Sequence, residues 1–315
     1  MKNLSIVFMG TPDFAVASLD AILKAGYPVK GVITAPDRPA GRGRKLRPSA
    51  VKQYALAHDL KVMQPTNLKD PVFLDELQQL QADVFVVVAF RMLPEAVWSM
   101  PPRGTFNLHA SLLPEYRGAA PINWAIIRGE KQTGVTTFFI DEKIDTGAII
   151  DQRKTEIGQN TTAGELHDTL MDLGAGLVTD TLEMIGQGTV QTKEQDKEAE
   201  VKTAPKIDRE STRIDWNKPV AEIHNLIRGM SPYPTAWTYL VNKGEEIPVK
   251  IFTASIAEGA TDTKPGQVFI DNRTMKVSGK DGWLELYEIQ MPGKRKMSVQ
   301  DVLNGIEIEK SAKMR

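Results

Sequence analysis

The apolar run Val84–Ala89, which reads Val-Phe-Val-Val-Val-Ala, constrains the fold more than any other feature of the chain. A strand with one solvent-facing side alternates apolar and polar residues, whereas a strand covered by helices on both faces is apolar throughout. Leu4–Met9 and Val29–Ala35 have the same character, and stretches with helical periodicity separate these runs. The alternation predicts an α/β domain with a doubly wound, Rossmann-like parallel sheet.

The same reading extends over the first two thirds of the chain. Strands are expected at Leu4–Met9, Val29–Ala35, Lys61–Met63, Val84–Ala89, Thr105–His109, Val135–Ile140 and Ala148–Gln152. Helices are expected from Pro12 to Ala25 and over Ala50–His58, Pro71–Leu80 and Ile122–Arg128. A long helix begins at the capping box Thr162–Glu165, and its leucine stripe is typical of core packing.

The character of the sequence changes after the polar stretch Gln191–Lys206, which we interpret as a linker. Beyond a short helix at Val220–Arg228, short β segments alternate with Gly and Pro, for example Trp237–Val241 and Trp283–Ile289. Strands at this spacing predict a small β-barrel, similar to an oligonucleotide-binding (OB-like) domain. We therefore expect three parts: a catalytic domain at 1–190, a linker at 191–206 and a barrel at 207–315.

The composition, with 41% hydrophobic and 25% charged residues among 315, is that of a globular protein with a real core. The chain has no cysteine, which excludes disulfides, thiolate nucleophiles and cysteine-ligated zinc. Its four histidines do not favour a histidine-rich metal site. Because no apolar run has the length of a signal peptide core or a membrane span, we expect a soluble, cytoplasmic protein.

A basic segment runs from Thr34 to Lys52. Its charged residues are Arg38, Arg42, Arg44, Lys45, Arg47 and Lys52 against Asp37, a balance of 6 − 1 = +5. Prolines within it argue against regular structure, so we expect a flexible loop. Most such runs are simply solvated, but against a chain of net charge −1 this one indicates a surface suited to phosphates.

Asn107 and His109 lie two residues apart at the end of an expected strand, so their side chains project from the same face. At the carboxyl edge of a doubly wound sheet, such a pair is suited to stabilising charge on a reacting carbonyl. A lone Asn-x-His is more often a solvated strand end. Asp145 adds a carboxylate in a loop, although its local sequence before Gly147 also fits an Asx-type turn.

Common nucleotide and hydrolase motifs are absent from the sequence. Gly10–Phe14 lacks the Gly-x-Gly-x-x-Gly pattern of dinucleotide-binding loops, and there is neither a P-loop lysine nor a nucleophile elbow. Asn107, His109 and a carboxylate therefore remain as the candidates for catalysis.

Larger segments resemble the formyltransferase superfamily that uses 10-formyltetrahydrofolate. They are Asn107–Pro121, Gly134–Thr136 and Asp145–Gly147. The stretches Val7–Ala15 and Ile214–Pro234, together with the basic segment, are similar to the methionyl-tRNA formyltransferase family specifically. The resemblance covers nearly the whole chain.

The resemblance implies transfer of a formyl group from 10-formyltetrahydrofolate to methionyl initiator tRNA. Separately, we expect the protein to be a monomer. Asn107, His109 and Asp145 align with the family's catalytic trio. The same alignment places the folate along Ser111, Leu112, Leu113 and Pro114 and the loop after Val84–Ala89. It places Arg42, Arg44 and Lys45 of the basic segment at the tRNA acceptor stem, and it makes the barrel a tRNA-binding domain. Lys294, Arg295 and Lys296 fit either an extension of that contact or a simple solvated turn. The loop Phe90–Pro94 departs from the family pattern, because it is shorter and lacks a glycine.

These residue types suit direct transfer between two amines. The amine attacks the formyl carbon and produces an oxyanion. A protonated His109 and the Asn107 carboxamide can stabilise this oxyanion, each well-placed donor contributing on the order of a few kcal/mol. Asp145 favours the imidazolium and helps to move the proton. Neither a metal nor a covalent intermediate is needed. The alternatives are a formyltransferase acting on a small amine (glycinamide ribotide or an amino sugar), a formyltetrahydrofolate hydrolase, and a non-enzymatic RNA-binding protein.

Overall fold

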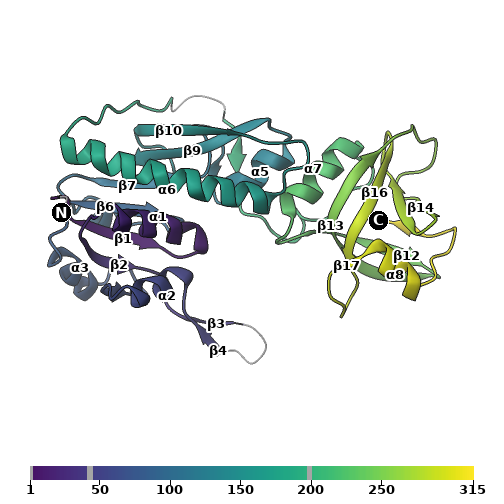
Figure 1. Ribbon diagram of the computed structural model, residues 1–315, viewed down its shortest axis with the longest axis horizontal. Coiled ribbons are helices and arrows are strands. Elements are labelled where there is room, and N and C mark those ends of the chain that lie inside the picture. Colours follow the sequence, from purple (N-terminus) through teal and green to yellow (C-terminus); the bar gives the residue numbers. More distant parts are fainter. Residues whose placement is uncertain (1–2, 41–44, 197–200) are drawn as a thin grey trace. The chain divides into compact units, whose positions relative to one another are not determined.

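The computed structural model describes residues 3–40, 45–196 and 201–315 of the chain (Figure 1). The chain forms two compact units. The first comprises Met1–Gly118, Thr133–Thr155 and His167–Thr203, and the second comprises Ala119–Gln132, Glu156–Leu166 and Ala204–Arg315. Among the described residues, no helix is both long and apolar enough to span a membrane.

A seven-stranded sheet forms the centre of the first unit, in the order β10-β9-β7-β6-β1-β2-β5. Its strands are β1 (Ile6–Gly10), β2 (Val29–Ile33), β5 (Val62–Met63), β6 (Val84–Val88), β7 (Thr105–His109), β9 (Gln132–Phe139) and β10 (Ile149–Glu156). The pairs from β5 to β7 are parallel, and β7 pairs with β9 in the antiparallel direction. The predicted doubly wound sheet is confirmed, with antiparallel pairing added on one side.

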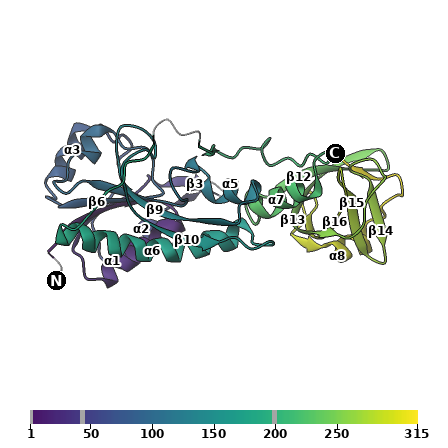
Figure 2. The ribbon, with the colours of Figure 1, turned by 90° about the horizontal axis from the view of Figure 1, so that it is seen from above.

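Helices cover both faces of this sheet, as the continuous apolar strands require. They are α1 (Asp13–Lys24), α2 (Ala50–Ala57), α3 (Pro71–Gln78), α4 (Glu95–Trp98) and α6 (Ala163–Gln187). Figure 2 shows α3 on one face of the sheet and α1 and α6 on the other. One core cluster joins residues of α3 and α4 to Val7, Met9 and Val87.

The predicted capping box at the start of α6 is confirmed. The Thr162 N–H donates to the Glu165 carboxylate at 2.8 Å, and the Glu165 N–H donates back to the Thr162 hydroxyl at 3.3 Å.

Farther along α6, a Cβ added to Gly174 would lie 2.7 Å from Leu108 of β7. The backbone of α6 therefore passes close to one face of β7, which leaves Asn107 and His109 on the opposite face.

The basic segment contains regular structure, so the predicted absence of it is wrong. The strands β3 (Arg38–Ala40) and β4 (Lys45–Arg47) form an antiparallel pair that places Arg38 opposite Arg47. Pro39 is tolerated because a proline in a two-stranded ribbon can direct its missing N–H away from the ladder. Asp37 accepts a hydrogen bond from Lys52 at 2.7 Å, and this contact, followed by one from Gln64, lowers the pKa of its carboxyl.

The second unit contains the C-terminal barrel that the sequence predicts. Its sheet has the order β14-β15-β16-β13-β12-β18, and β17 also pairs with β16. The strands are β12 (Ala236–Asn242), β13 (Glu245–Ala257), β14 (Val268–Asp271), β15 (Thr274–Ser278), β16 (Trp283–Gln290), β17 (Met297–Ser298) and β18 (Lys313–Met314). A bridge between Gln267, just before β14, and Lys313 of β18 nearly closes the sheet into a barrel.

Three helices belong to the second unit: α5 (Pro121–Ile127), α7 (Val220–Met230) and α8 (Val299–Gly305). Residues of α7 and α8 pack in the barrel's hydrophobic core. The side chain of Asn123 in α5 donates to the Gly229 carbonyl of α7 at 2.7 Å, so the two helices approach closely. Two short strands, β8 (Arg117–Gly118) and β11 (Thr203–Ala204), form a separate two-stranded sheet.

Candidate active site

The carboxyl end of β7 holds Asn107 and His109 on one face of the sheet. Asn107 pairs in register with Val87 of β6 and Phe138 of β9, and His109 lies opposite Thr136 of β9. His109 is buried, with 6% of its surface exposed, whereas Asn107 is half-buried. Among the residues that the structure describes, none hydrogen-bonds the Asn107 carboxamide. Its N–H groups are therefore available to an incoming oxygen.

Both ring nitrogens of His109 have defined neighbours. Nε2 lies 2.9 Å from the backbone carbonyl of Tyr116, and Nδ1 lies 3.8 Å from Oδ2 of Asp145. A carbonyl oxygen only accepts hydrogen bonds, so Nε2 carries a hydrogen and donates it to Tyr116. In the neutral ring, Nδ1 is then the basic nitrogen, and it faces the carboxylate.

Asp145 lies in the loop between β9 and β10. Its Oδ2 accepts a hydrogen bond from the Gly118 N–H at 3.0 Å and is the oxygen nearest to His109. The Asp145 backbone has φ +56°, in the left-handed region that few residues other than Gly adopt. The structure thus brings two of the three predicted catalytic side chains into direct apposition, and places the third on the same strand and face as His109.

The predicted folate segment follows β7 directly and is divided between buried and half-buried residues. Ser111 and Leu113 are buried, while Leu112 and Pro114 are half-buried. The Ser111 hydroxyl donates to the Glu115 carbonyl at 2.6 Å. Ser111 therefore shapes the turn from within, and Leu112 and Pro114 are the members with surface to offer a ligand.

Thr136 of β9 organises the backbone of this segment. Its fully buried hydroxyl donates to the Ser111 carbonyl at 2.6 Å and accepts from the Leu113 N–H at 3.1 Å. Gln152 of β10 donates to the same hydroxyl at 2.9 Å and to the Leu113 carbonyl at 3.0 Å. Strands β9 and β10 thereby fix the path of the chain directly after His109.

Of the three predicted tRNA-contacting residues, one lies in the described β3–β4 hairpin. Lys45 is the first residue of β4. Arg42 and Arg44 lie outside the residues that the structure describes. The described hairpin also carries Arg38 and Arg47, which lie opposite each other, and the neighbouring Leu46 is 66% exposed.

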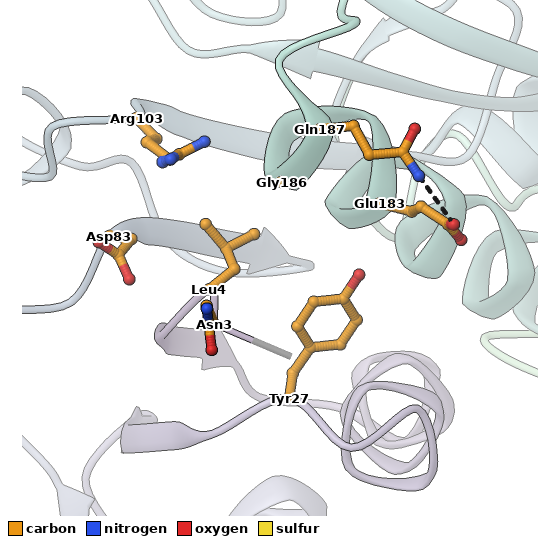
Figure 3. A pocket seen from close by; sticks show the side chains of 8 residues that line it. All are labelled: Asn3, Leu4, Tyr27, Asp83, Arg103, Glu183, Gly186 and Gln187. Atoms are coloured by element: carbon orange, nitrogen blue, oxygen red, sulfur yellow. Dashed lines mark hydrogen bonds between the residues drawn. The ribbon is translucent and has the colours of Figure 1, made fainter. Parts of the chain in front are cut away.

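A cavity of about 280 Å³ lies at the amino ends of the strands, opposite the edge that holds His109. It is lined by Asn3, Leu4, Tyr27, Asp83, Arg103, Glu183, Gly186 and Gln187. Figure 3 shows the Tyr27 ring pointing toward Glu183 and Gln187 of α6. The Asp83 carboxylate accepts from the Ser5 hydroxyl at 2.6 Å and its N–H at 2.7 Å, which lowers the pKa of Asp83. These contacts tie together the amino ends of the strands, far from the predicted catalytic residues.

The comparisons with known proteins follow the same division of the chain. The formyl transferase family matches residues 2–182, and the formyl transferase C-terminal domain matches residues 206–307. The chain belongs to the formyl transferase family. The methionyl-tRNA formyltransferase of Flavobacterium johnsoniae is 54% identical to it over 314 residues, covering 100% of both chains. The methionyl-tRNA formyltransferase of Bacteroides fragilis is 48% identical over 319 residues, covering 100% of this chain and 98% of the relative.

Solved structures share the fold of this formyl transferase. An N-formyltransferase from Helicobacter canadensis, in complex with folinic acid and dTDP-3-aminofucose, has a TM-score of 0.68 at 24% identity and covers 90% of this chain and 98% of its own. HypX from Aquifex aeolicus, in complex with tetrahydrofolic acid, has a TM-score of 0.65 at 19% identity, covering 96% of this chain and 48% of its own. The family resemblance and the fold class predicted from the sequence are confirmed.

The loop Phe90–Pro94 of this formyl transferase, where the sequence departs from the family pattern, is held by its own arginine. The Arg91 guanidinium donates to the carbonyls of Pro65 and Thr66, the latter at 3.0 Å, and lies 5.6 Å from the centre of the Phe90 ring. Burial lowers the pKa of Arg91. Arg91 thus anchors this loop to the segment between β5 and α3.

Three residues of this site are not predicted from the sequence pattern. They are Tyr116, whose carbonyl holds His109; Thr136, whose hydroxyl holds the folate segment; and Gln195, which contacts the backbone of Asp145. Tyr116 and Thr136 lie inside the segments that resemble the family, and that resemblance is the one sequence signal that could have identified them. Gln195 lies in the polar stretch interpreted as a linker.

Proposed function

We propose that this formyl transferase moves the formyl group of 10-formyltetrahydrofolate onto the α-amino group of methionyl initiator tRNA. One observation carries the proposal: both domains of the chain align over their full length with proteins named methionyl-tRNA formyltransferase, at 54% identity for the Flavobacterium johnsoniae relative. The geometry at the end of β7 supports the chemistry, and the basic hairpin and barrel support the choice of acceptor.

The reaction exchanges one C–N bond for another. The amine nitrogen bonds to the formyl carbon, and the carbonyl electrons move onto oxygen. When the tetrahedral species collapses, the bond from carbon to N10 breaks. One proton leaves the attacking nitrogen and one reaches N10, so that the products are the formylated amine and tetrahydrofolate. The protein must therefore stabilise an oxyanion and carry a proton.

Asn107 and His109 stabilise the oxyanion in this proposal. The Asn107 carboxamide has no hydrogen-bond partner among the described residues and can donate to the oxygen without breaking an existing contact. A preorganised donor of this kind contributes roughly 3–4 kcal/mol to transition-state stabilisation in other enzymes. Once His109, buried beside Asn107, has taken up the proton of the attacking amine, it adds positive charge where little water screens it.

His109 and Asp145 carry the proton. Because Nε2 of His109 already donates to Tyr116, a proton taken from the attacking amine is accommodated on Nδ1. The Asp145 carboxylate, 3.8 Å from Nδ1, stabilises the positive charge that develops on the ring. At this distance a bridging water can connect the two groups and deliver the proton onward to N10.

The donor lies, in this proposal, against the segment Ser111–Pro114 and the loop Phe90–Pro94. Leu112 and Pro114 offer half-buried apolar surface beside His109 in the chain, and Thr136 keeps their backbone in place. Apolar walls with few polar groups are typical of sites for planar ligands such as a pterin. The exposed Met92, with 76% of its surface accessible, gives the loop further apolar surface.

The tRNA contacts would come from the β3–β4 hairpin and from the barrel. In the second unit, a cavity of about 680 Å³ is lined by Tyr233, Trp237, Arg209 and Lys250, among others. The Arg209 and Arg213 guanidinium groups lie 4.9 and 5.6 Å from the Trp237 ring centre. Cations interleaved with aromatic rings are typical of nucleic-acid surfaces. Lys296 is less available, because it pairs with Glu288 at 2.9 Å.

The deciding experiment is a formyl-transfer assay with methionyl initiator tRNA, methionyl elongator tRNA and small amines as acceptors. We expect formylation of the initiator in strong preference to both other acceptors. Formylation of a small amine with none of the initiator would contradict the proposal. If the protein releases formate from 10-formyltetrahydrofolate without any amine as fast as it transfers formyl groups in the presence of one, it is a hydrolase instead.

A further inference from the structure

Gln195 is a buried residue in a polar stretch of chain. Its neighbours Glu194 and Asp196 are exposed, while Gln195 itself has 5% of its surface accessible. Two backbone hydrogen bonds of 2.8 Å between Lys193 and Ile149 attach the segment to the start of β10. Glutamine is rarely buried without a specific set of partners, so the contacts of this side chain require an explanation.

All four hydrogen bonds of the Gln195 carboxamide go to the immediate surroundings of Asp145. Nε2 donates to the backbone carbonyls of Asp145 at 3.0 Å and Gly147 at 2.8 Å. Oε1 accepts from Arg117 through Nε at 3.2 Å and Nη2 at 2.7 Å. Carbonyls only accept and a guanidinium only donates, so the network itself fixes which end of the carboxamide is the oxygen.

These contacts form a hydrogen-bond network around the Asp145 carboxylate. Gln195 holds the backbone of Asp145 directly, and it holds Arg117 through Oε1. The next residue, Gly118, donates its N–H to Asp145 Oδ2 at 3.0 Å, and this is the oxygen that faces His109. One side chain therefore fixes both the backbone of Asp145 and the chain segment that orients its carboxylate.

The loop that carries Asp145 needs such support. Asp145 has φ +56°, a conformation that costs on the order of 1 kcal/mol or more for a residue other than Gly and persists only when the surroundings enforce it. Gly147 packs so closely on β9 that an added Cβ would lie 1.7 Å from the Phe139 carbonyl. Gln195 bonds the carbonyls of both residues, so it holds the strained turn against β9 and keeps the carboxylate directed at His109.

We infer that Gln195 is a positioning residue for formyl transfer, which acts by holding the Asp145 carboxylate against His109. The inference rests on the proposed function and deepens it, because it adds to the site a residue from a segment that the sequence marks only as polar. Gln195 touches neither His109 nor the reacting atoms in this scheme. Its main effect runs through the Asp145 carboxylate, and that makes it separable from a general effect on folding.

Two substitutions at Gln195 and one control test the inference. Gln195→Leu removes all four hydrogen bonds, and Gln195→Glu keeps the acceptor for Arg117 but loses both donors to the loop. Displacement of a catalytic group costs about tenfold to 100-fold in rate, so we expect kcat to fall by that factor in both variants, with KM for the folate donor within about twofold of wild type. The control, Gln191→Leu, changes an exposed glutamine in the same segment and should leave both constants unchanged.

A double-mutant cycle distinguishes positioning from loss of structure. In an Asp145→Asn background, Gln195→Leu should cause little further loss of kcat, because the carboxylate that it positions is already gone. Wild-type kcat in Gln195→Leu, full activity in Gln195→Glu, or losses that multiply in the double variant would each overturn the inference.

Amide hydrogen exchange gives a measurement that does not depend on the acceptor. Peptides covering 141–148 should exchange faster in Gln195→Leu than in wild type or Gln191→Leu, while peptides from α6 remain unchanged. Unchanged exchange over 141–148 would overturn the inference. If wild-type protein formylates no tRNA, the proposed function fails, and the exchange data still decide whether Gln195 holds the Asp145 loop.

Discussion

Nε2 of His109 lies 2.9 Å from the backbone carbonyl of Tyr116, and this contact determines which ring nitrogen is free to accept a proton. The carbonyl requires a hydrogen on Nε2, so Nδ1 is left to exchange protons beside Asp145. The contact also fixes the ring plane, because the turn from Ser111 to Tyr116 is anchored to β9 through Thr136.

Substitutions at His109 should separate proton exchange on Nδ1 from the hydrogen bond that Nε2 donates to Tyr116. Glutamine places an amide nitrogen near the position of Nε2 and can keep the bond to Tyr116, whereas alanine cannot. Both His109→Gln and His109→Ala should lower kcat by roughly 100-fold to 10,000-fold, as removal of a general base does. Only alanine also loses the hydrogen bond to the Tyr116 carbonyl, at a cost of about 0.5–1.5 kcal/mol in the free energy of unfolding. Steady-state kinetics and urea unfolding check the pair; equal stability of the two variants would contradict the role of the Tyr116 contact.

Substitution of Asn107 should affect the rate without affecting stability. Asn107→Ala removes a donor to the oxyanion, with an expected loss of roughly 100-fold to 1,000-fold in kcat. The melting temperature should stay near that of wild type, because no described residue hydrogen-bonds this carboxamide. Asn107→Asp, which places negative charge beside the oxyanion, should be slower still. An Asn107→Asp enzyme as active as wild type would exclude oxyanion stabilisation at this position.

Thr136 should matter for binding of the donor, and its neighbour Thr137 serves as the control. Both hydroxyls are buried, but Thr136 bonds the folate segment while Thr137 bonds Thr181 of α6 at 2.8 Å. Each Thr→Val change removes buried hydrogen bonding and should lower the free energy of unfolding by about 0.5–1.5 kcal/mol per bond lost. Only Thr136→Val should also raise KM for 10-formyltetrahydrofolate, in a steady-state assay below the melting temperature. The same rise in Thr137→Val would show that the effect is not specific to the folate segment.

Neutralising the basic segment should weaken the use of tRNA and its dependence on salt. Arg42→Ala and Arg44→Ala together should raise KM for methionyl-tRNA. They should also reduce the slope of log affinity against log salt by about one for each phosphate that the protein no longer neutralises. Lys30→Ala, which removes an exposed cation of β2, is the control. Rates with a saturating small-molecule acceptor should not change, and a parallel loss there would argue for an effect on the catalytic residues instead.

The sequence predicts most helices and strands of this protein well, because these elements depend on local patterns. The continuous apolar run of β6 and the Thr162–Glu165 capping box each specify their element from a few neighbouring residues. The β3–β4 hairpin is not predicted because its prolines argue against strands, although a two-stranded ribbon tolerates them. Gln195 could not be predicted at all: its partners Asp145, Gly147 and Arg117 lie 48 to 78 residues away in the chain, so only the tertiary fold shows that it is buried.

The pH dependence of stability should contain a contribution from His224 in α7. Burial, followed by the charge of Arg228, lowers the pKa of His224 below its usual 6.5. In the pH range just below 6.5 the unfolded chain then binds a proton that the folded barrel does not, so stability decreases as pH falls. The limiting slope for one proton is about 1.4 kcal/mol per pH unit. His224→Gln should remove this part of the slope between about pH 7.5 and 5.5, where few carboxyl groups titrate. Urea unfolding of wild type and variant at several pH values checks the difference, and identical slopes would show that His224 charges as readily in the folded chain as in the unfolded one.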